Sequence, residues 1–500
     1  MNLMMLLEMA SSSFGERVAI TNGDDQLTYA ELFQAAGAAG ARAKSTGADY
    51  FSMLDESSLA FPIALFGAAW AGIPFVPLNY RLTGDELEAL LSRVEPSILL
   101  CEPGRSESLL KREKCAVVDR EDFLFAARQD AAPRLDAEWS MDPEEIAILL
   151  FTSGTTGAPK AAVLRHLHIV SYILSTVEFM SADEDAAQLV CVPPYHIAGI
   201  ASLASSVYSG RRIVQLPSFT AEAWLETAQR EKITNAMVVP TMLSRILEAL
   251  EGQEHADLPH LEAISYGGGK MPQAVIERAM RLFPDTNFAN AYGLTETSST
   301  ISILGPDDHR IAMSSDDPAV RKRITSVGQP IPSIEVEIRD DEGKTLGPGE
   351  RGEIFVRGEQ VSGEYQGKGS LLLDDGFFPT RDGGYLDDEG YLYVEGRIDD
   401  IIVRGGENMS PGEIEDVLLD HDSVADVAVV GVPDEQWGEC VVAAIVLHAD
   451  QSASEGELQQ WVKNRLRSSR TPDRIMFTNE LPYNETGKLL RRKVREDFID

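Results

Sequence analysis

Short apolar runs alternate with helical patterns over most of the chain, and this alternation constrains the fold more than any other feature. Residues 146–151 and 236–239 are apolar runs of strand length. Residues 167–179 and 274–282 repeat apolar side chains at the spacing of a helix that buries one face. The sequence therefore predicts an α/β fold built in layers, with buried strands.

The last hundred residues differ in texture from the rest. Residues 382–400 are rich in Gly, Asp and Tyr. After them come expected helices at 411–419 and 457–466 and expected strands at 427–432, 441–447 and 474–478. A chain of 500 residues has room for roughly two to four domains. We therefore expect a large N-terminal α/β domain over residues 1–397 and a small α+β domain over residues 398–500.

The charge balance argues against nucleic acids and anionic membranes as partners. The chain holds 44 Lys and Arg against 80 Asp and Glu, a net charge of −36, and such a surface repels phosphate backbones and anionic headgroups. Residues 463–500 are the exception, because ten basic residues there outnumber six acidic ones. This excess is either a solvated helix face or a surface near a polyphosphate.

Cysteine usage and the chain ends favour a cytoplasmic location. Four cysteines in 500 residues show no zinc-binding spacing, which is typical of a reducing compartment. The start contains Glu8 and no basic segment, and no apolar stretch is long and uninterrupted enough to span a membrane. The last residues match neither a peroxisomal address nor a prenylation motif.

The strongest local motif is a loop rich in glycine and hydroxyl groups after the strand expected at 146–151. It reads Phe151-Thr-Ser-Gly-Thr-Thr-Gly-Ala-Pro-Lys160. Glycines let backbone N–H groups approach an anion, hydroxyls add donors and Lys160 adds positive charge. Pro159 and Ala161 flank the lysine, so the loop is not a Walker A motif. Its composition fits either a polyphosphate loop or a mobile surface loop.

Six motifs occur in the order and spacing of one enzyme family. They are this loop and the segments Asn290-Ala-Tyr-Gly-Leu-Thr-Glu296, Thr380-Arg-Asp-Gly-Gly384, Gly396-Arg397, Gly405-Gly406-Glu407 and Pro482-Tyr-Asn-Glu-Thr-Gly-Lys488. From about residue 6 to residue 494 the chain thus resembles the adenylate-forming enzymes, which include acyl-CoA synthetases, adenylation domains and firefly luciferase. The resemblance implies that a carboxylate attacks the α-phosphate of ATP, that a thiol then takes the acyl group from the acyl-adenylate, and that the small C-terminal domain is mobile.

The resemblance also implies which residues bind the phosphates. Thr295 resembles the α-phosphate donor and Glu296 the Mg²⁺ ligand, which fits the preference of Mg²⁺ for a carboxylate, water and phosphate oxygens. Taken alone, these two residues are typical of a helix start. The residues implied at the β- and γ-phosphates are Thr152, Ser153, Gly154, Thr155, Thr156, Gly157 and Lys160.

The adenosine site is implied in the same way. The residues expected at adenine are Tyr292, Gly268, Gly269 and Ala291. Asp382 and Arg397 match the residues that the family places at the ribose hydroxyls. Taken singly, an aromatic residue more often packs in a core, and an Asp with an Arg more often forms a surface ion pair.

Two positions depart from the family pattern. Arg381 stands where the family usually has Gly, and we expect it to pair with Asp382 or to point into solvent. Ala161 replaces the Gly that commonly follows the loop lysine, which is tolerated if its φ is negative.

The remaining implied roles concern the acid, CoA and domain movement. His196 resembles the residue that gates the carboxylate site, although a lone His is more often structural. Asp399 stands at the family's hinge, and Gly405 and Gly406 would border the pantetheine channel of CoA after rotation. Lys488 resembles the mobile lysine that bridges carboxylate and α-phosphate. The predicted catalytic residues are Lys488, Thr295, Glu296 and His196.

These features predict an acyl-CoA synthetase that uses ATP, CoA and Mg²⁺ on a hydrophobic carboxylic acid, such as a fatty acid. Residues 192–208 lack the Asp that holds the substrate ammonium in amino-acid-activating relatives, which disfavours an amino acid. Small residues at 198–204 fit either a roomy pocket or a tightly packed helix. The alternatives are a stand-alone enzyme that loads a carrier protein and a noncatalytic nucleotide-binding regulatory protein. The expected partners are small molecules, and a homodimer is left open.

Overall fold

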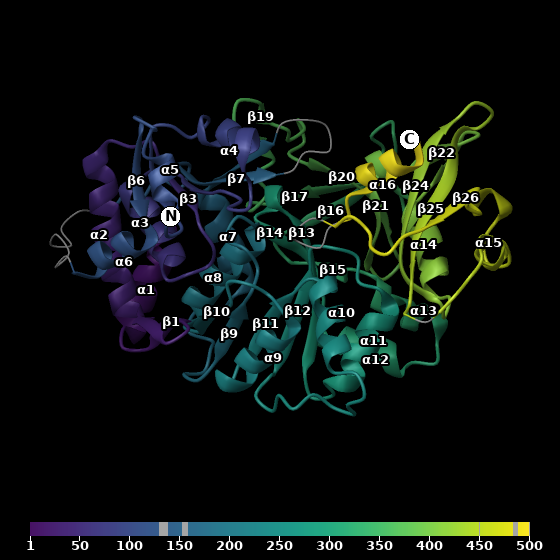
Figure 1. Ribbon diagram of the computed structural model, residues 1–500, viewed down its shortest axis with the longest axis horizontal. Helices are drawn as coiled ribbons and strands as arrows, with labels where there is room; N and C mark the ends of the chain where they lie inside the picture. The colour runs from purple at the N-terminus through teal and green to yellow at the C-terminus, as the bar shows by residue number, and fades with distance from the viewer. Residues whose placement is uncertain (130–138, 153–158, 450, 484–488, 500) are drawn as a thin grey trace.

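The protein consists of a large N-terminal α/β part and a smaller C-terminal domain, which lies on the right in Figure 1. This computed structural model describes residues 1–129, 139–152, 159–449, 451–483 and 489–499. The helices of the large part are α1 (Met4–Phe14), α2 (Tyr29–Thr46), α3 (Ala60–Ala71), α4 (Gly84–Leu91), α5 (Ser106–Leu109), α6 (Arg120–Gln129), α7 (His166–Thr176), α8 (Ile197–Ser209), α9 (Ala221–Arg230), α10 (Pro240–Ala249), α11 (Gln273–Leu282), α12 (Pro306–Ser314) and α13 (Pro318–Lys322). The predicted α/β fold class is confirmed.

Two mixed sheets carry the large part. The first has the order β15 (Gln329–Pro330), β14 (Ser299–Leu304), β13 (Asn287–Leu294), β12 (Ala263–Gly267), β11 (Asn235–Val238), β9 (Ala187–Val190), β10 (Arg212–Gln215), β1 (Val18–Asn22), β2 (Asp25–Thr28). The second has the order β19 (Gly369–Ser370), β18 (Glu364–Tyr365), β8 (Lys160–Arg165), β7 (Ile146–Thr152), β4 (Phe75–Pro77), β3 (Tyr50–Leu54), β5 (Ser97–Cys101), β6 (Cys115–Asp119).

The inner strands of both sheets are parallel, which collects their carboxyl ends at common edges. In the first sheet β12 is parallel to β11 and β13, and in the second β4 is parallel to β3 and β7. Ligands of such sheets bind in crevices outside the carboxyl ends of the strands. The carboxyl end of β7, the loop after β12 and the turn after β13 therefore lie where a ligand site is expected.

Helices α2 and α3 show how the sequence sets the packing of the core. Thr28 and Glu31 form a capping box at the start of α2. Small residues line one face of this helix, and a methyl group on Gly40 would lie only 2.8 Å from Cβ of Trp70. The close approach lets Trp70 on α3 bury its ring in the largest apolar cluster.

Two smaller sheets complete the chain. The third has the order β16 (Glu335–Arg339), β17 (Gly352–Arg357), β20 (Phe378–Leu386), β21 (Leu392–Arg397). The fourth belongs to the C-terminal domain, with the order β23 (Glu407–Met409), β22 (Ile402–Arg404), β25 (Gly438–Leu447), β24 (Val424–Asp434), while β26 (Arg474–Phe477) pairs with β25. Its helices are α14 (Pro411–Leu419), α15 (Glu455–Lys463) and α16 (Arg491–Ile499).

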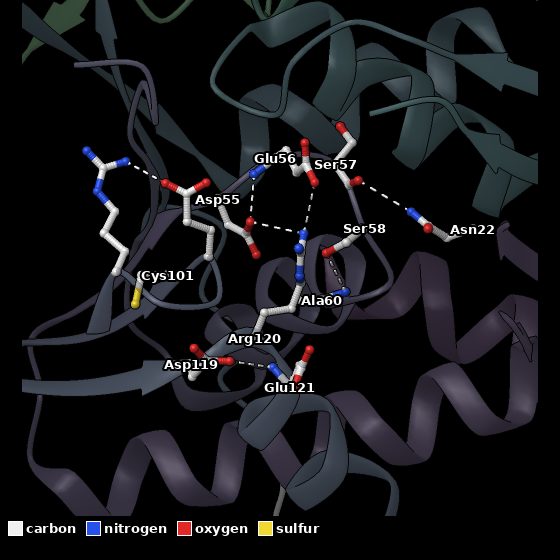
Figure 2. A network of polar contacts seen from close by, with 12 residues as sticks. Asn22, Asp55, Glu56, Ser57, Ser58, Ala60, Cys101, Asp119, Arg120 and Glu121 are labelled. Carbon is white, nitrogen blue, oxygen red and sulfur yellow. Dashed lines mark hydrogen bonds and ion pairs between the residues drawn. The ribbon is translucent and has the colours of Figure 1, made fainter. Parts of the chain in front are cut away.

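A polar cluster lies at the carboxyl end of β3, outside the predicted site (Figure 2). The buried carboxylate of Asp55 accepts hydrogen bonds from Arg120, 3.1 Å away, and from the backbone N–H of Glu56. Burial raises the pKa of Asp55 to about 7. Glu56, Arg120 and Ser57 also line a cavity of about 250 Å³.

In the described part of the chain, no helix is long and apolar enough to cross a membrane.

Candidate active site

The start and end of the predicted phosphate loop are held together by a pair of strands. Thr152, the last residue of β7, is paired with Lys160, the first of β8, and its hydroxyl donates to the Lys160 carbonyl at 3.3 Å. Ala161 is buried within β8, so a methyl group is accommodated there. The predicted residues Ser153, Gly154, Thr155, Thr156 and Gly157 lie outside the described residues.

A tyrosine that the sequence analysis missed connects Lys160 to the predicted metal ligand. The Lys160 ammonium lies 5.6 Å from the centre of the Tyr365 ring, a cation–π contact. The Tyr365 hydroxyl donates a hydrogen bond to the carboxylate of Glu296. Burial and the charge of Glu296 raise the pKa of Tyr365, so its hydroxyl stays protonated. Tyr365 lies on β18, which pairs with β8, and no local motif marks it.

Glu296 and Thr295 occupy a short 3₁₀ turn, Thr295–Thr297, directly after β13. The Glu296 carbonyl accepts the backbone N–H of Ser362 at 2.8 Å, which fixes the turn against the segment before Tyr365. Ser298, the residue that follows this turn, has a left-handed backbone with φ 56°. Non-glycine residues are strained in this region, and such strain clusters at functional sites.

Tyr292 and Arg397, both partly buried, meet the buried Asp382 in one network. The Tyr292 hydroxyl donates to Asp382 at 2.6 Å, and Arg397 donates to the other carboxylate oxygen at 3.0 Å. Asp382 and Arg397 are directly paired on β20 and β21, so the hairpin itself brings them together. Burial and Asp382 hold the pKa of Tyr292 well above its ordinary value. The Nε of Arg397 is buried without a hydrogen-bond partner among the described residues.

The predicted adenine residues lie side by side at the ends of β12 and β13. Gly267 is paired with Ala291, and a side chain on Gly267 would come within 2.2 Å of the Ala291 carbonyl oxygen. Gly268 follows with φ 79°, a left-handed conformation that suits glycine. The chain therefore brings Gly268, Gly269, Ala291 and Tyr292 to one edge, next to Asp382.

The expected pairing of Arg381 with Asp382 is wrong, whereas its side chain is exposed to solvent as the other expectation had it. Its guanidinium donates to Asp399 at 2.8 Å and lies 3.6 Å from Glu353, instead of pairing with Asp382. The cause is a left-handed backbone at Arg381, with φ 63°, together with the register that commits Asp382 to Arg397.

His196 precedes α8 and is neutral at pH 7. Burial lowers its pKa to about 4. Its Nε2 atom is buried and makes no hydrogen bond within the described chain, which leaves one polar ring atom for a ligand. The following small residues favour the packed-helix alternative, because Ala201 and Ala204 are buried and a methyl group on Gly199 would lie 2.9 Å from the Pro193 carbonyl oxygen.

The predicted CoA residues Gly405 and Gly406 make their contacts within the C-terminal domain. Gly405 and Gly406 form the tip of the hairpin of β22 and β23, where the Gly405 N–H donates to the carbonyl of Trp437 in the same domain. In Figure 1, β22 lies on the side of the C-terminal domain that is turned away from β13. Lys488 lies outside the described residues.

Comparison with known proteins agrees with this geometry. Residues 7–366 match the AMP-binding enzyme family, and residues 413–488 match the AMP-binding enzyme C-terminal domain. The chain belongs to the AMP-binding enzyme family. The predicted membership of the adenylate-forming enzymes is thereby confirmed.

Several relatives of this AMP-binding enzyme are similar over nearly their whole length. It is 32% identical over 485 residues to 2-succinylbenzoate–CoA ligase of Bacillus licheniformis, covering 96% of each chain. It is 31% identical over 488 residues to feruloyl-CoA synthase of an Amycolatopsis species, again with 96% of each chain covered. The o-succinylbenzoate CoA synthetase of Bacillus subtilis, solved with its acyl-adenylate OSB-AMP, is 29% identical with a TM-score of 0.84, covering 98% of this chain and 97% of the other. The same enzyme has been solved with ATP and magnesium, with a TM-score of 0.83, 29% identity and 98% of each chain covered.

Proposed function

We propose that this protein activates an aromatic carboxylic acid with ATP and transfers the acyl group to CoA. The protein is an AMP-forming acid–thiol ligase. The observation that carries the proposal is the meeting of Tyr292, Asp382 and Arg397 at the end of β13, one turn away from Glu296. A stacking ring, an acceptor for ribose hydroxyls and a metal ligand are what bound ATP requires.

The residues around Glu296 fit a magnesium ion held mainly by the nucleotide. The described residues contain no group of three or more His, Cys, Asp or Glu side chains that could hold a metal by themselves. Mg²⁺ usually keeps several waters and takes one or two carboxylates together with phosphate oxygens, so a single Glu296 is a suitable ligand. Bound there, the ion would neutralise charge on the phosphates. Tyr365 would orient the carboxylate through its hydrogen bond.

The chain's own groups can hold the reacting parts of the substrates. We propose that Thr295 donates to the α-phosphate and that the phosphate loop with Lys160 holds the β- and γ-phosphates. Lys488 would neutralise charge that grows during attack by the carboxylate. Neutral His196 would face the carboxylate side, with its unpartnered Nε2 available for a hydrogen bond.

The names of two relatives support an aromatic acid as the substrate class. These relatives are 2-succinylbenzoate–CoA ligase and feruloyl-CoA synthase, and the acid in each name is an aromatic carboxylate. Ser202 Oγ on α8 lies 3.8 Å from Met237 Sδ, and Cys191 Sγ lies 3.8 Å from Met242 Sδ. Sulfur atoms make favourable contacts with aromatic rings and adapt to irregular shapes.

The boundary between residues 397 and 398, the hinge role of Asp399 and the approach of Gly405 and Gly406 to CoA belong to the same proposal. A cytoplasmic location fits the use of ATP and CoA. The expected partners are the acid, ATP and CoA, and a homodimer stays a prediction.

Pyrophosphate release with a panel of acids tests the proposal. Purified protein, ATP and Mg²⁺ are mixed with aromatic acids, fatty acids and amino acids, with and without CoA, and the products are identified by mass spectrometry. We expect pyrophosphate, AMP and a thioester with at least one aromatic acid. Activity on fatty acids alone would contradict the substrate class, and pyrophosphate release without thioester would contradict CoA as acceptor.

A further inference from the structure

An arginine of the large part forms an ion pair with the segment that joins the two domains. Between β21 and β22 the chain forms a short turn, Ile398–Asp400. Arg381 on β20 donates from its guanidinium to the Asp399 carboxylate at 2.8 Å. The second partner of Arg381 is Glu353 on β17, which accepts the Arg381 backbone N–H at 3.0 Å and lies 3.6 Å from the guanidinium. Arg381 therefore ties the connecting turn to the third sheet.

The backbone of Arg381 is held in a strained conformation that aims its side chain at the turn. Its φ of 63° lies in the left-handed region, which a residue with a side chain rarely adopts. Such a conformation persists only where surrounding contacts fix it. Glu353 supplies those contacts, since its side chain is only 18% exposed and is held within the sheet. Arg381 thus has both a strained backbone and an ion pair with Asp399, the predicted hinge residue.

A second cation of the large part forms an ion pair with the C-terminal domain itself. Lys270 follows Gly269, and its ammonium lies 2.6 Å from the carboxylate of Asp416 on α14. The same ammonium donates to the carbonyl of Gly412 at 3.4 Å, near the start of α14. Both cations belong to the large part, and both acids belong to the connecting turn or to the C-terminal domain.

We propose that Arg381 and Lys270 form a two-point latch, which holds the C-terminal domain in the orientation seen here and limits its rotation between the two half-reactions. This inference rests on the proposed function, because it needs a reaction in two steps. In this orientation β22 lies on the side of the C-terminal domain that is turned away from β13 (Figure 1), so CoA transfer requires rotation and the latch favours adenylation. Rotation must break both ion pairs.

The exposure of the four side chains determines how strongly the latch should shift the balance between the two domain orientations. The side chains of Arg381 and Asp399 are 50% and 45% exposed, and those of Lys270 and Asp416 are 47% and 57% exposed. Ion pairs that are half in water are weak, so each should shift the balance between the two orientations by about two- to five-fold. A shift of this size changes the timing of rotation without blocking it.

Two variants and a matched control test the latch. Arg381→Ala and Lys270→Ala each remove one cation, and Arg357→Ala removes an arginine of similar exposure that pairs with Glu335 at the other end of β17. Adenylation is measured by ATP–pyrophosphate exchange, and thioester formation is measured from supplied acyl-adenylate and CoA. The ratio of thioester formation to adenylation should rise about two- to five-fold in the two latch variants. It should stay unchanged in Arg357→Ala, and Arg381→Lys should recover part of the wild-type ratio.

Hydrogen exchange gives a readout that does not depend on activity. The Ile401 N–H bonds to the Ile398 carbonyl at 3.2 Å within the connecting turn. Without substrates, exchange over residues 398–401 should be about two- to five-fold faster in Arg381→Ala and unchanged in Arg357→Ala, because weakly protected amides exchange in proportion to opening. Equal exchange and equal ratios in all variants would overturn the latch, as would the same change in Arg357→Ala. If the wild type activates no acid, the proposed function fails, while the exchange result still decides the latch.

Discussion

Replacing Asp382 by Asn tests whether the buried network beside β13 binds ATP or only stabilises the fold. Asp382 is 6% exposed and accepts from the Tyr292 hydroxyl at 2.6 Å and from Arg397 at 3.0 Å. Asparagine has nearly the same shape, but it carries no charge and replaces one carboxylate oxygen with an amide nitrogen. The substitution therefore changes the electrostatics with little change in volume.

The expected loss of stability follows from these two bonds. A hydrogen bond to a charged group contributes about 1.5–3 kcal/mol, and a neutral one about 0.5–1.5 kcal/mol. Weakening both bonds to neutral strength should lower the free energy of unfolding by about 2–3 kcal/mol. The loss stays below the roughly 3–5 kcal/mol of a fully stranded ion, because Arg397 is 27% exposed and also donates to the Thr380 carbonyl at 3.1 Å.

If the carboxylate also accepts the ribose hydroxyls, ATP binding should weaken by about 10- to 100-fold, the equivalent of one charge-assisted hydrogen bond. Urea unfolding measures the stability, and calorimetric titration with ATP measures the affinity. Asp388→Asn is the matched control, because Asp388 is exposed in the turn that follows the same strand. Reduced stability with unchanged ATP affinity would refute the ribose assignment, and unchanged stability would refute the reasoning on the network.

Three further predictions concern the phosphate side and the buried histidines. Lys488→Ala should lower acyl-adenylate formation at least ~100-fold, as for loss of one preorganised donor, yet still convert supplied acyl-adenylate to thioester; unimpaired pyrophosphate exchange would exclude the role. Tyr365→Phe should raise the Mg²⁺ concentration needed for half-maximal pyrophosphate release several-fold, since Glu296 loses its hydroxyl partner, and an unchanged Mg²⁺ dependence would contradict this. The buried His166 and the partly buried His168, whose pKa values burial lowers to about 4, should make the free energy of unfolding fall as pH drops from about 6.5 to 4. Urea midpoints across this range check the effect, and His168→Gln should reduce the slope.

Local patterns predicted individual elements well, because their signals are contained in short stretches of chain. Residues 411–419 were expected to form a helix and α14 has these bounds, with Pro411 in its first turn. The expected helix at 167–179 is observed as His166–Thr176, since Val177 has an extended backbone that ends it. The hairpin of β20 and β21 likewise brings Asp382 and Arg397 together, as the resemblance implied.

Local sequence patterns did not predict contacts between segments that are far apart in the sequence. Tyr365 reaches Glu296 because β18 pairs with β8 about 200 residues earlier, and no short-range signal specifies that pairing. The direction of the Arg381 side chain depends on a φ of 63°, which the residue type disfavours and which only Glu353 and the sheet explain. The sequence therefore showed that position 381 departs from the family motif. Only the tertiary structure showed which residues the Arg381 side chain contacts.

The left-handed backbone of Arg381 bears on how such an enzyme could be engineered for heat resistance. Glycine at this position would relieve about 1–2 kcal/mol of backbone strain, while the half-exposed ion pair with Asp399 contributes about 1 kcal/mol or less. A screen for thermal stability alone would therefore favour Arg381→Gly. The selected variant would unfold at a higher temperature but would have lost one of the two ion pairs that form the latch. Selection for stability and selection for the timing of catalysis thus favour different residues at position 381.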